Sequence, residues 1–219
     1  VVSATNSLVG TTTDDYLGRD GVTALTNGNY VVAIPTWDHG SIEDAGAVTW
    51  GSGISGITGT VSAANSLVGS TANDQVGSAG VTALTNGNYV VRSQLWNRGS
   101  AVETGAVTWG SGSAGISGAV SLLNSHVGGI ARGTPKTVSL DPLNNHFMTF
   151  WETENKARLG SQENGFMPAP EMNVFGDGNL IASQDSIPTM FDGTDFLTVP
   201  IFNSVAKRTF TFSNTGNVA

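Results

Sequence analysis

The stretch "GVTALTNGNYVV" occupies residues 21–32, and the same twelve letters return at residues 80–91. Apolar residues alternate in it with polar or smaller ones, which is the pattern of a half-buried strand and not of a helix. Asn-Gly at its centre is the strongest short-range hairpin signal, because both central positions of a type I′ turn need a positive φ. We therefore expect two antiparallel strands, Val22–Thr26 and Asn29–Ile34, joined by a tight turn at Asn27-Gly28.

The doubled stretch belongs to a longer internal repeat. Asn6, Asn65 and Asn124 each begin an Asn-Ser-Leu-Val-Gly string, with His in place of Leu in the last, and they lie 59 residues apart. Two tryptophan positions keep the same spacing. A fixed period of this length is typical of architectures in which one small unit is stacked several times. The spacing predicts two full repeats and a degenerate third, at residues 6–64, 65–123 and 124–166.

Each full repeat contains four short strand-like stretches. The hairpin supplies two, residues 46–53 supply a third with Val48 and Trp50 on one face, and residues 61–69 supply a fourth. A lone sheet of this size leaves its apolar faces exposed, so neighbouring repeats must stack on it. We expect an all-β fold of tandem four-stranded antiparallel blades of about 59 residues, like those of a β-propeller. A parallel β-solenoid is the less favoured alternative, because the hairpin implies antiparallel pairing.

Composition excludes several classes of protein. Only 12% of the residues are charged, against about 25% in an average globular domain, and the net charge is −8. Such a chain lacks the Lys and Arg surface that nucleic acid requires, so we expect no nucleic-acid partner. It contains no cysteine, which excludes disulfides and thiolate metal ligands, and no apolar stretch of about 20 residues, so we expect no membrane span. Both ends look cut, which predicts a segment of a longer protein.

The repeats resemble the FG-GAP repeat of integrin-alpha-type propellers over residues 1–123, and more weakly to about residue 165. The matching motifs are Leu8–Gly10, Asp15–Gly18, Val31–Pro35 and Gly46–Trp50 in the first repeat, and Leu67–Gly69, Asp74–Gly77, Val90–Gln94 and Gly105–Trp109 in the second. They also resemble the glycine-rich repeats of large haemagglutinin-like surface proteins of bacteria. The resemblance implies a β-propeller in a secreted or cell-surface protein.

One part of the FG-GAP pattern is missing. The family often carries a calcium loop between its first two strands, whereas this chain has only Thr26–Asn29 there, and Thr85–Asn88 in the second repeat. Calcium needs six to eight oxygen ligands, mostly carboxylates, and a tight turn without a carboxylate cannot supply them. We therefore expect no resident metal and no other cofactor.

The composition changes from Met167 onward. Residues 170–219 resemble the start of the choice-of-anchor group of immunoglobulin-like domains in bacterial surface proteins. The residues that carry this resemblance are Pro170–Val174 with Gly176 and Gly178, then Asp192–Phe196, then Thr209–Phe212 with Asn214–Gly216. The resemblance implies a partial immunoglobulin-like β-sandwich at residues 167–219, after propeller-type repeats at residues 1–166. The remainder of such a sandwich is expected downstream or in another chain.

The two full repeats differ most in the segments that follow their hairpins, residues 33–45 and 92–104. A Trp stays in place in both segments while the residues after it change. Loops on a rigid scaffold commonly carry recognition, and a Trp can stack on a sugar ring or anchor a protein. The candidate binding residues are Trp37, Asp38, His39, Trp96, Asn97 and Arg98. In the alternative, which we favour, each Trp packs between blades.

Acidic residues gather in the first repeat. They are Asp14, Asp15, Asp20, Asp38, Glu43 and Asp44. Most of their counterparts in the second repeat are not acidic, so we interpret them as solvated loop residues, with weak calcium binding as the alternative. The three histidines have no metal-binding spacing, and no Gly-x-Ser-x-Gly motif marks a nucleophile.

These observations predict a protein that is not an enzyme. We expect a structural or adhesive segment of a large secreted bacterial surface protein, assembling through open β edges into a ring or a filament. Its partners are then other copies of itself or the remainder of a longer chain. The alternative is a carbohydrate-binding module that holds glycans with its Trp-bearing loops.

Overall fold

The computed structural model describes residues 1–166, 172–176, 179–181 and 210–214. The chain divides into two compact units, Val1–Phe166 and Met167–Ala219. The described residues form strands and one short 3₁₀ helix at Glu152–Glu154, and no α-helix, so the all-β prediction is confirmed. The strands of the first unit are β1 (Leu8–Val9), β2 (Val22–Ala24), β3 (Tyr30–Ile34), β4 (Ala47–Gly51), β5 (Gly59–Thr60), β6 (Ser66–Val68), β7 (Val81–Ala83), β8 (Tyr89–Ser93), β9 (Ala106–Gly110), β10 (Gly118–Ala119), β11 (Ser125–Val127), β12 (Thr137–Asp141), β13 (His146–Trp151), β14 (Lys156–Ser161) and β15 (Gly165–Phe166).

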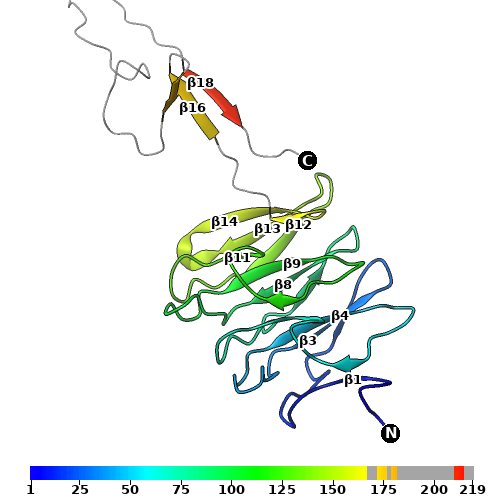
Figure 1. The fold of residues 1–219 in the computed structure, drawn as a ribbon. Coiled ribbons are helices and arrows are strands. Elements are labelled where there is room, and N and C mark those ends of the chain that lie inside the picture. Colours follow the sequence, from blue (N-terminus) through cyan, green and yellow to red (C-terminus); the bar gives the residue numbers. More distant parts are fainter. Residues whose placement is uncertain (167–171, 177–178, 182–209, 215–219) are drawn as a thin grey trace, which may run out of the picture. The chain divides into compact units, whose positions relative to one another are not determined.

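Three antiparallel meanders of four strands make up most of this unit (Figure 1). We call them layers 1, 2 and 3; their strand orders are β2-β3-β4-β6, β7-β8-β9-β11 and β12-β13-β14-β15. Layers 1 and 2 each take their last strand from the beginning of the following repeat. The Ser66 hydroxyl forms a buried hydrogen bond of 2.7 Å with Thr49, and Ser125 does the same with Thr108. The Asn-Ser-Leu-Val string thus completes the preceding sheet.

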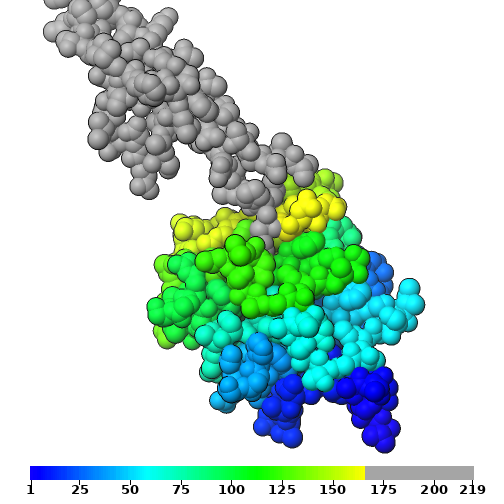
Figure 2. Space-filling view, in the orientation of Figure 1, coloured from blue at the N-terminus to red at the C-terminus, as the bar shows by residue number. Residues whose placement is uncertain are grey.

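Each full repeat also has a short parallel pairing between its first and last strands. β5 pairs with β1, and β10 pairs with β6, so β10 becomes a fifth strand of the layer 1 sheet. The backbone of the second repeat is therefore hydrogen-bonded to layer 1 as well as packed on it. Figure 2 shows the repeats of residues 1–166 following one another in the order of the chain.

The core consists of clusters of apolar side chains that lie between the layers and on the N-terminal side of layer 1. Successive residues of a strand point to opposite faces, and β3 follows this rule: Val31 and Ala33 face layer 2, while Val32 and Ile34 face the N-terminal segment. Val48 and Trp50 of β4 lie with the first pair, as predicted. β8 continues the pattern, because Tyr89 and Val91 face layer 1 and Val90 faces layer 3.

The hairpin turn differs from the predicted type I′ turn. Leu25 accepts a hydrogen bond from the Gly28 N–H, and the Leu25 N–H donates to the Asn29 carbonyl, so the loop has three residues and the strands are shorter than expected. Gly28 has a φ of 88°, but Asn27 is not among the residues with positive φ. This is a type I turn followed by a left-handed glycine. The Asn27 side chain stabilises it by accepting a hydrogen bond from the Asn29 N–H.

The C-terminal unit is described only in its strands, β16 (Met172–Gly176), β17 (Asn179–Ile181) and β18 (Phe210–Asn214). They form an antiparallel sheet in the order β17-β16-β18. Of the predicted immunoglobulin-like motifs, residues 170–171, 178, 192–196, 209 and 215–216 lie outside the described residues.

Candidate functional site

The two candidate tryptophans lie inside the stack of layers. Trp37 is 2% exposed and belongs to the apolar cluster on the N-terminal side of layer 1, and Trp96 is 5% exposed in the cluster between layers 1 and 2. Neither indole N–H has a hydrogen-bond acceptor among the described residues. A ligand stacking on either ring would have to displace the packing around it, so these positions fit the favoured packing interpretation better than the binding one.

The residues that follow each Trp serve the loop's own structure. The Asp38 carboxylate accepts hydrogen bonds from the Asp44 N–H and the Thr12 hydroxyl, and the Asn97 side chain likewise accepts one from the Glu103 N–H. His39 stacks on Trp37 with ring centroids 5.1 Å apart. His39 and its counterpart Arg98 each reach the carbonyl of the glycine that ends the next Asn-Ser-x-Val-Gly string, Gly69 or Gly128.

A buried carboxylate joins two loops of this region. Asp74 is fully buried, and its Oδ2 accepts hydrogen bonds from the backbone N–H groups of Ser70 (2.9 Å) and Thr71 (2.8 Å). Its Oδ1 accepts from the Thr71 hydroxyl, the Asn97 N–H (3.0 Å) and the Asn97 side-chain amide (2.9 Å). One side chain thus fastens the loop at residues 70–74 to the loop that carries Trp96.

Asp15 does the same in the first repeat and is buried, so the prediction that the acids of this repeat are solvated is wrong for Asp15. It accepts hydrogen bonds from the N–H groups of Thr11, Thr12 and Asp38. Burial acts to raise the pKa of Asp15, but these hydrogen bonds and that of the Thr12 hydroxyl outweigh it, and the pKa lies below its ordinary value of 3.8. The carboxylate therefore contributes stability above about pH 3.8 that is lost as the pH falls through the lowered pKa.

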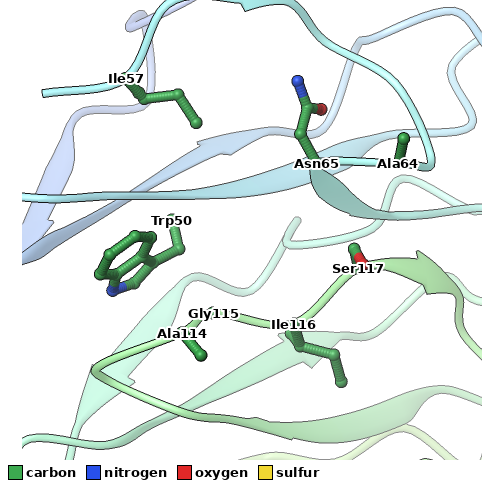
Figure 3. Close-up of a pocket in the computed structure, with 8 residues that line it drawn as sticks. All are labelled: Trp50, Ile57, Ala64, Asn65, Ala114, Gly115, Ile116 and Ser117. Atoms are coloured by element: carbon green, nitrogen blue, oxygen red, sulfur yellow. The ribbon is translucent and has the colours of Figure 1, made fainter.

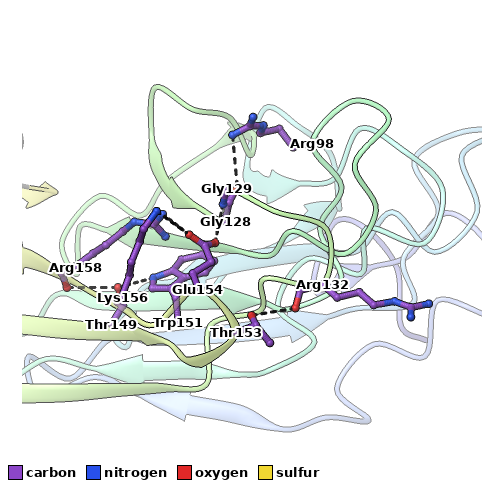
Figure 4. A network of polar contacts seen from close by, with 10 residues as sticks. All are labelled: Arg98, Gly128, Gly129, Arg132, Thr149, Trp151, Thr153, Glu154, Lys156 and Arg158. Carbon is purple, nitrogen blue, oxygen red and sulfur yellow. Dashed lines mark hydrogen bonds and ion pairs between the residues drawn. The ribbon is translucent and has the colours of Figure 1, made fainter. Parts of the chain in front are cut away.

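The third repeat keeps this clamp with a residue from a different place in the chain. Gly133 stands where Asp15 and Asp74 stand, and the carboxylate comes from Glu154, whose Oε1 accepts a hydrogen bond of 2.6 Å from the Gly129 N–H (Figure 4). Gly129 corresponds to Ser70 and Thr11, so the same backbone N–H is bound in all three repeats. The Glu154 side chain is almost fully buried and forms ion pairs with Arg158 (3.2 Å) and Lys156 (3.5 Å).

A second repeated device joins one layer to the next; we call it the carbonyl ladder. Three donors of the first repeat converge on the Gly112 carbonyl oxygen of the second: the side-chain amides of Asn27 and Asn29, both at 2.8 Å, and the Trp50 indole N–H at 2.9 Å. Asn86, Asn88 and Trp109 make the same three contacts with the Gln162 carbonyl oxygen, at 2.8, 2.8 and 3.1 Å.

The ladder is continuous because the second asparagine of each turn binds on both sides. The Asn29 Oδ1 accepts a hydrogen bond from the Gly53 N–H of its own repeat at 3.0 Å, and the Asn88 Oδ1 accepts one from the Gly112 N–H at 2.8 Å. The Thr-Asn-Gly-Asn turn, expected from the sequence to be a hairpin turn without a calcium site, thus also supplies contacts between repeats. Its identical occurrence in both repeats was the signal for this role.

A groove of about 200 Å³ lies beside Trp50, between the first and second repeats (Figure 3). Ile57, Ala64 and Asn65 line one side and residues 114–117 the other, and the polar side chains among these are Asn65 and Ser117. The Asn65 side chain is engaged in the turn before β6, where its amide donates to the Thr60 carbonyl and its oxygen accepts from the Ser62 N–H. The volume is below the roughly 300–1,000 Å³ of typical small-molecule sites.

His126 makes the stability of the contact between layers 2 and 3 depend on pH. It replaces the Leu of the repeated string on β11, and burial together with the nearby Arg158 lowers its pKa to about 4. Below pH 6.5 the unfolded chain takes up a proton that the folded chain excludes, so stability falls between pH 6.5 and about pH 4.

His126→Leu, which copies Leu67, should abolish this loss. Because His126 is only partly buried, we expect roughly 2 kcal/mol of the unaltered chain's unfolding free energy to disappear between pH 7.5 and 4.5 through this residue. Urea unfolding of both chains at the two pH values measures it. Acid effects from carboxylates are common to both chains, so an equal loss in the two would contradict the prediction.

The described residues contain no group of three or more His, Cys, Asp or Glu side chains that could hold a metal ion. No helix among them is long and apolar enough to cross a membrane.

Comparison with known proteins places the repeat in a family. No curated protein and no solved structure gave a significant match to the chain. A family model described as a repeat of unknown function, DUF5650, matches residues 1–19, 24–78 and 83–134, which is more than half of the chain. These segments contain the Asp15 and Asp74 clamps and the asparagines of both turns. The chain therefore belongs to the DUF5650 repeat family.

Proposed function

We propose that this chain is a non-catalytic structural segment of a large secreted bacterial surface protein, in which repeats stack to hold other parts at a fixed spacing. The carbonyl ladder is the observation that supports this proposal. Three side-chain donors of one repeat meet a single carbonyl oxygen of the next, both between layers 1 and 2 and between layers 2 and 3. The side chains of the turn asparagines, Asp15 and Asp74 are likewise bound to backbone groups.

The stacked layers also support the finer proposal of propeller-type blades. Each layer is a four-stranded antiparallel meander, and the chain returns from its last strand to the opposite edge of the next layer, as it does between propeller blades. The contacts between β2 and β7 bring the first strands of adjacent layers together. Three layers are fewer than the four to eight of a closed ring, so further repeats or other copies would complete it.

The carbohydrate-binding alternative now rests on a different tryptophan. Trp50 is partly exposed and lines the groove between the repeats, whereas Trp37 and Trp96 are buried. Glycan binding by the full chain that is lost in Trp50→Ala, with the fold retained, would favour this function over a purely structural one.

Hydrogen exchange followed by mass spectrometry tests the structural proposal. If the layers form one block, the amides of β3, β8 and β13 exchange through a single unfolding event with one free energy. Asn29→Ala removes a hydrogen bond on each side of the ladder, and we expect β3 to open about 2 kcal/mol more easily than β13 in that variant.

Thr58→Ala, at an exposed position of the same repeat, is the control and should leave all three strands coupled. Separate exchange of β3, β8 and β13 in the unaltered chain would refute the structural proposal, because layers that open independently cannot hold a fixed spacing.

A further inference from the structure

The face of layer 1 that points away from layer 2 shares most of its residues with the equivalent face of layer 2, which another repeat covers. We call it the N-terminal face; it includes Val22, Ala24, Tyr30 and Gly53, and belongs to the blue end of the unit in Figure 2. Its counterpart on layer 2, 59 residues later in the chain, is covered by the first repeat. Comparing the two faces shows what one more repeat would change.

Apolar positions are more exposed on the N-terminal face than on its covered counterpart. Val22 is 59% exposed, whereas Val81 is partly buried. Tyr30 is partly exposed, and Tyr89 is fully buried. The twelve residues from 21 to 32 are nevertheless identical to residues 80–91. An exposed Val-Thr-Ala strand would not require the same residues as a covered one. Identical residues are expected if both strands pack against the same kind of neighbouring repeat.

One carbonyl group of the face has no hydrogen-bond donor among the described residues. The Gly112 carbonyl oxygen accepts three hydrogen bonds from the first repeat. Gly53, its counterpart, is exposed, and its carbonyl oxygen accepts none from the described residues. The Gly53 N–H is bound to the Asn29 side chain just as the Gly112 N–H is bound to that of Asn88, so the two glycines have equivalent partners within their own repeats.

From these observations, and resting on the proposed stacking function, we propose that the N-terminal face is a docking surface for one more repeat of this family. That repeat presents a Thr-Asn-Gly-Asn turn and a tryptophan in the register that the first repeat uses on the second. Its two turn asparagines and its indole N–H donate to the Gly53 carbonyl oxygen. Its residues equivalent to Val31, Ala33 and Val48 pack on the side chains around Tyr30.

The charges of the first repeat are compatible with this contact. Arg19 and Asp20 replace Ser78 and Ala79 of the second repeat. Ser78 stays exposed and Ala79 partly exposed although their face is covered, so these positions lie at the rim. A docked repeat would therefore leave the Arg19–Asp20 ion pair in contact with solvent.

The absence of cysteine from the sequence allows a direct test by thiol labelling. The native chain carrying Val22→Cys is compared with an extended chain in which a copy of residues 6–64 precedes Asn6 in place of residues 1–5. We expect rapid labelling in the native chain, and in the extended chain a loss of labelling to the level of Val81→Cys. Ala24→Cys, also at an exposed position, serves as a second probe if Val22→Cys folds poorly.

The matched control is the extended chain whose added copy carries Asn27→Ala, Asn29→Ala and Trp50→Ala, and there labelling at residue 22 should recover. Unchanged labelling in the extended chain would overturn the proposal, whether or not the added copy folds. Protection of the native chain that grows with its concentration would also overturn it, because a second copy would then be the occupant. Neither outcome bears on the coupling of β3, β8 and β13 in the native chain, so the structural proposal is tested separately.

Discussion

Asp74→Ala is expected to lower the free energy of unfolding by about 4 kcal/mol, near the upper end for single substitutions. The carboxylate accepts five hydrogen bonds, and its removal leaves the donors of Ser70, Thr71 and Asn97 without their acceptor. Each buried donor left unpaired costs about 1–3 kcal/mol, although Ser70 and Thr71 can recover part of this by binding water. Urea unfolding followed by tryptophan fluorescence measures the loss.

Asp20→Ala is the matched control, because Asp20 is exposed and has only a surface ion pair with Arg19 at 3.7 Å. It should change stability by less than about 0.5 kcal/mol. If Asp74→Ala does not fold, Asp74→Asn, which keeps one acceptor oxygen, gives an intermediate loss that can be measured. Equal effects of Asp74→Ala and Asp20→Ala would show that the buried carboxylate does not fasten the loops.

Gly77→Ala is expected to cost about 3 kcal/mol, and Gly18→Ala, at the equivalent position of the first repeat, only about 1 kcal/mol. Both glycines have a left-handed backbone, with φ of 85° and 82°, so the strain of adding a Cβ is the same. At Gly77 the added Cβ would lie 2.6 Å from a methyl carbon of Val48, whereas at Gly18 it would meet nothing within 4 Å. The remaining difference of about 2 kcal/mol is the cost of overpacking the contact between layers 1 and 2.

Gly18→Ala is the control for Gly77→Ala, because the same substitution is made at the equivalent position with the same backbone conformation. Thermal and urea unfolding of the two chains under identical conditions gives the difference directly. Equal losses would mean that the contact between repeats relaxes without cost, and that the tight packing of Gly77 on Val48 contributes nothing to stability.

Much of the fold follows from local patterns in the sequence. Alternation with a period of two places Val48 and Trp50 on one face, and the structure has both there. The 59-residue spacing predicted stacked units of small antiparallel sheets, which the structure contains. The turn type was not determined in this way, because Asn-Gly is compatible with more than one turn. The turn adopted brings Asn27 and Asn29 onto a carbonyl of the following repeat.

The candidate site was less accessible to sequence reasoning. Trp37 and Trp96 were recognised as repeated, but whether a repeated Trp is exposed or buried depends on the layer beside it. Asp15 and Asp74 recur at the same spacing, which was a usable signal of a structural role. For Glu154 the sequence contained no such signal, because it binds the Gly129 N–H from a position that does not lie 59 residues after Asp74.

The sequence by itself determined the period of the repeat and the alternation of its strands. The period is visible because the same residues recur every 59 positions, and the alternation depends only on neighbouring residues. The tertiary structure alone decided which polar residues hold the repeats together. A carboxylate becomes buried, or a carbonyl collects three donors, only when segments far apart in sequence meet. Gly53 and Gly112 stand at equivalent positions of the repeat, yet one is exposed and the other buried, solely because of what is packed on each.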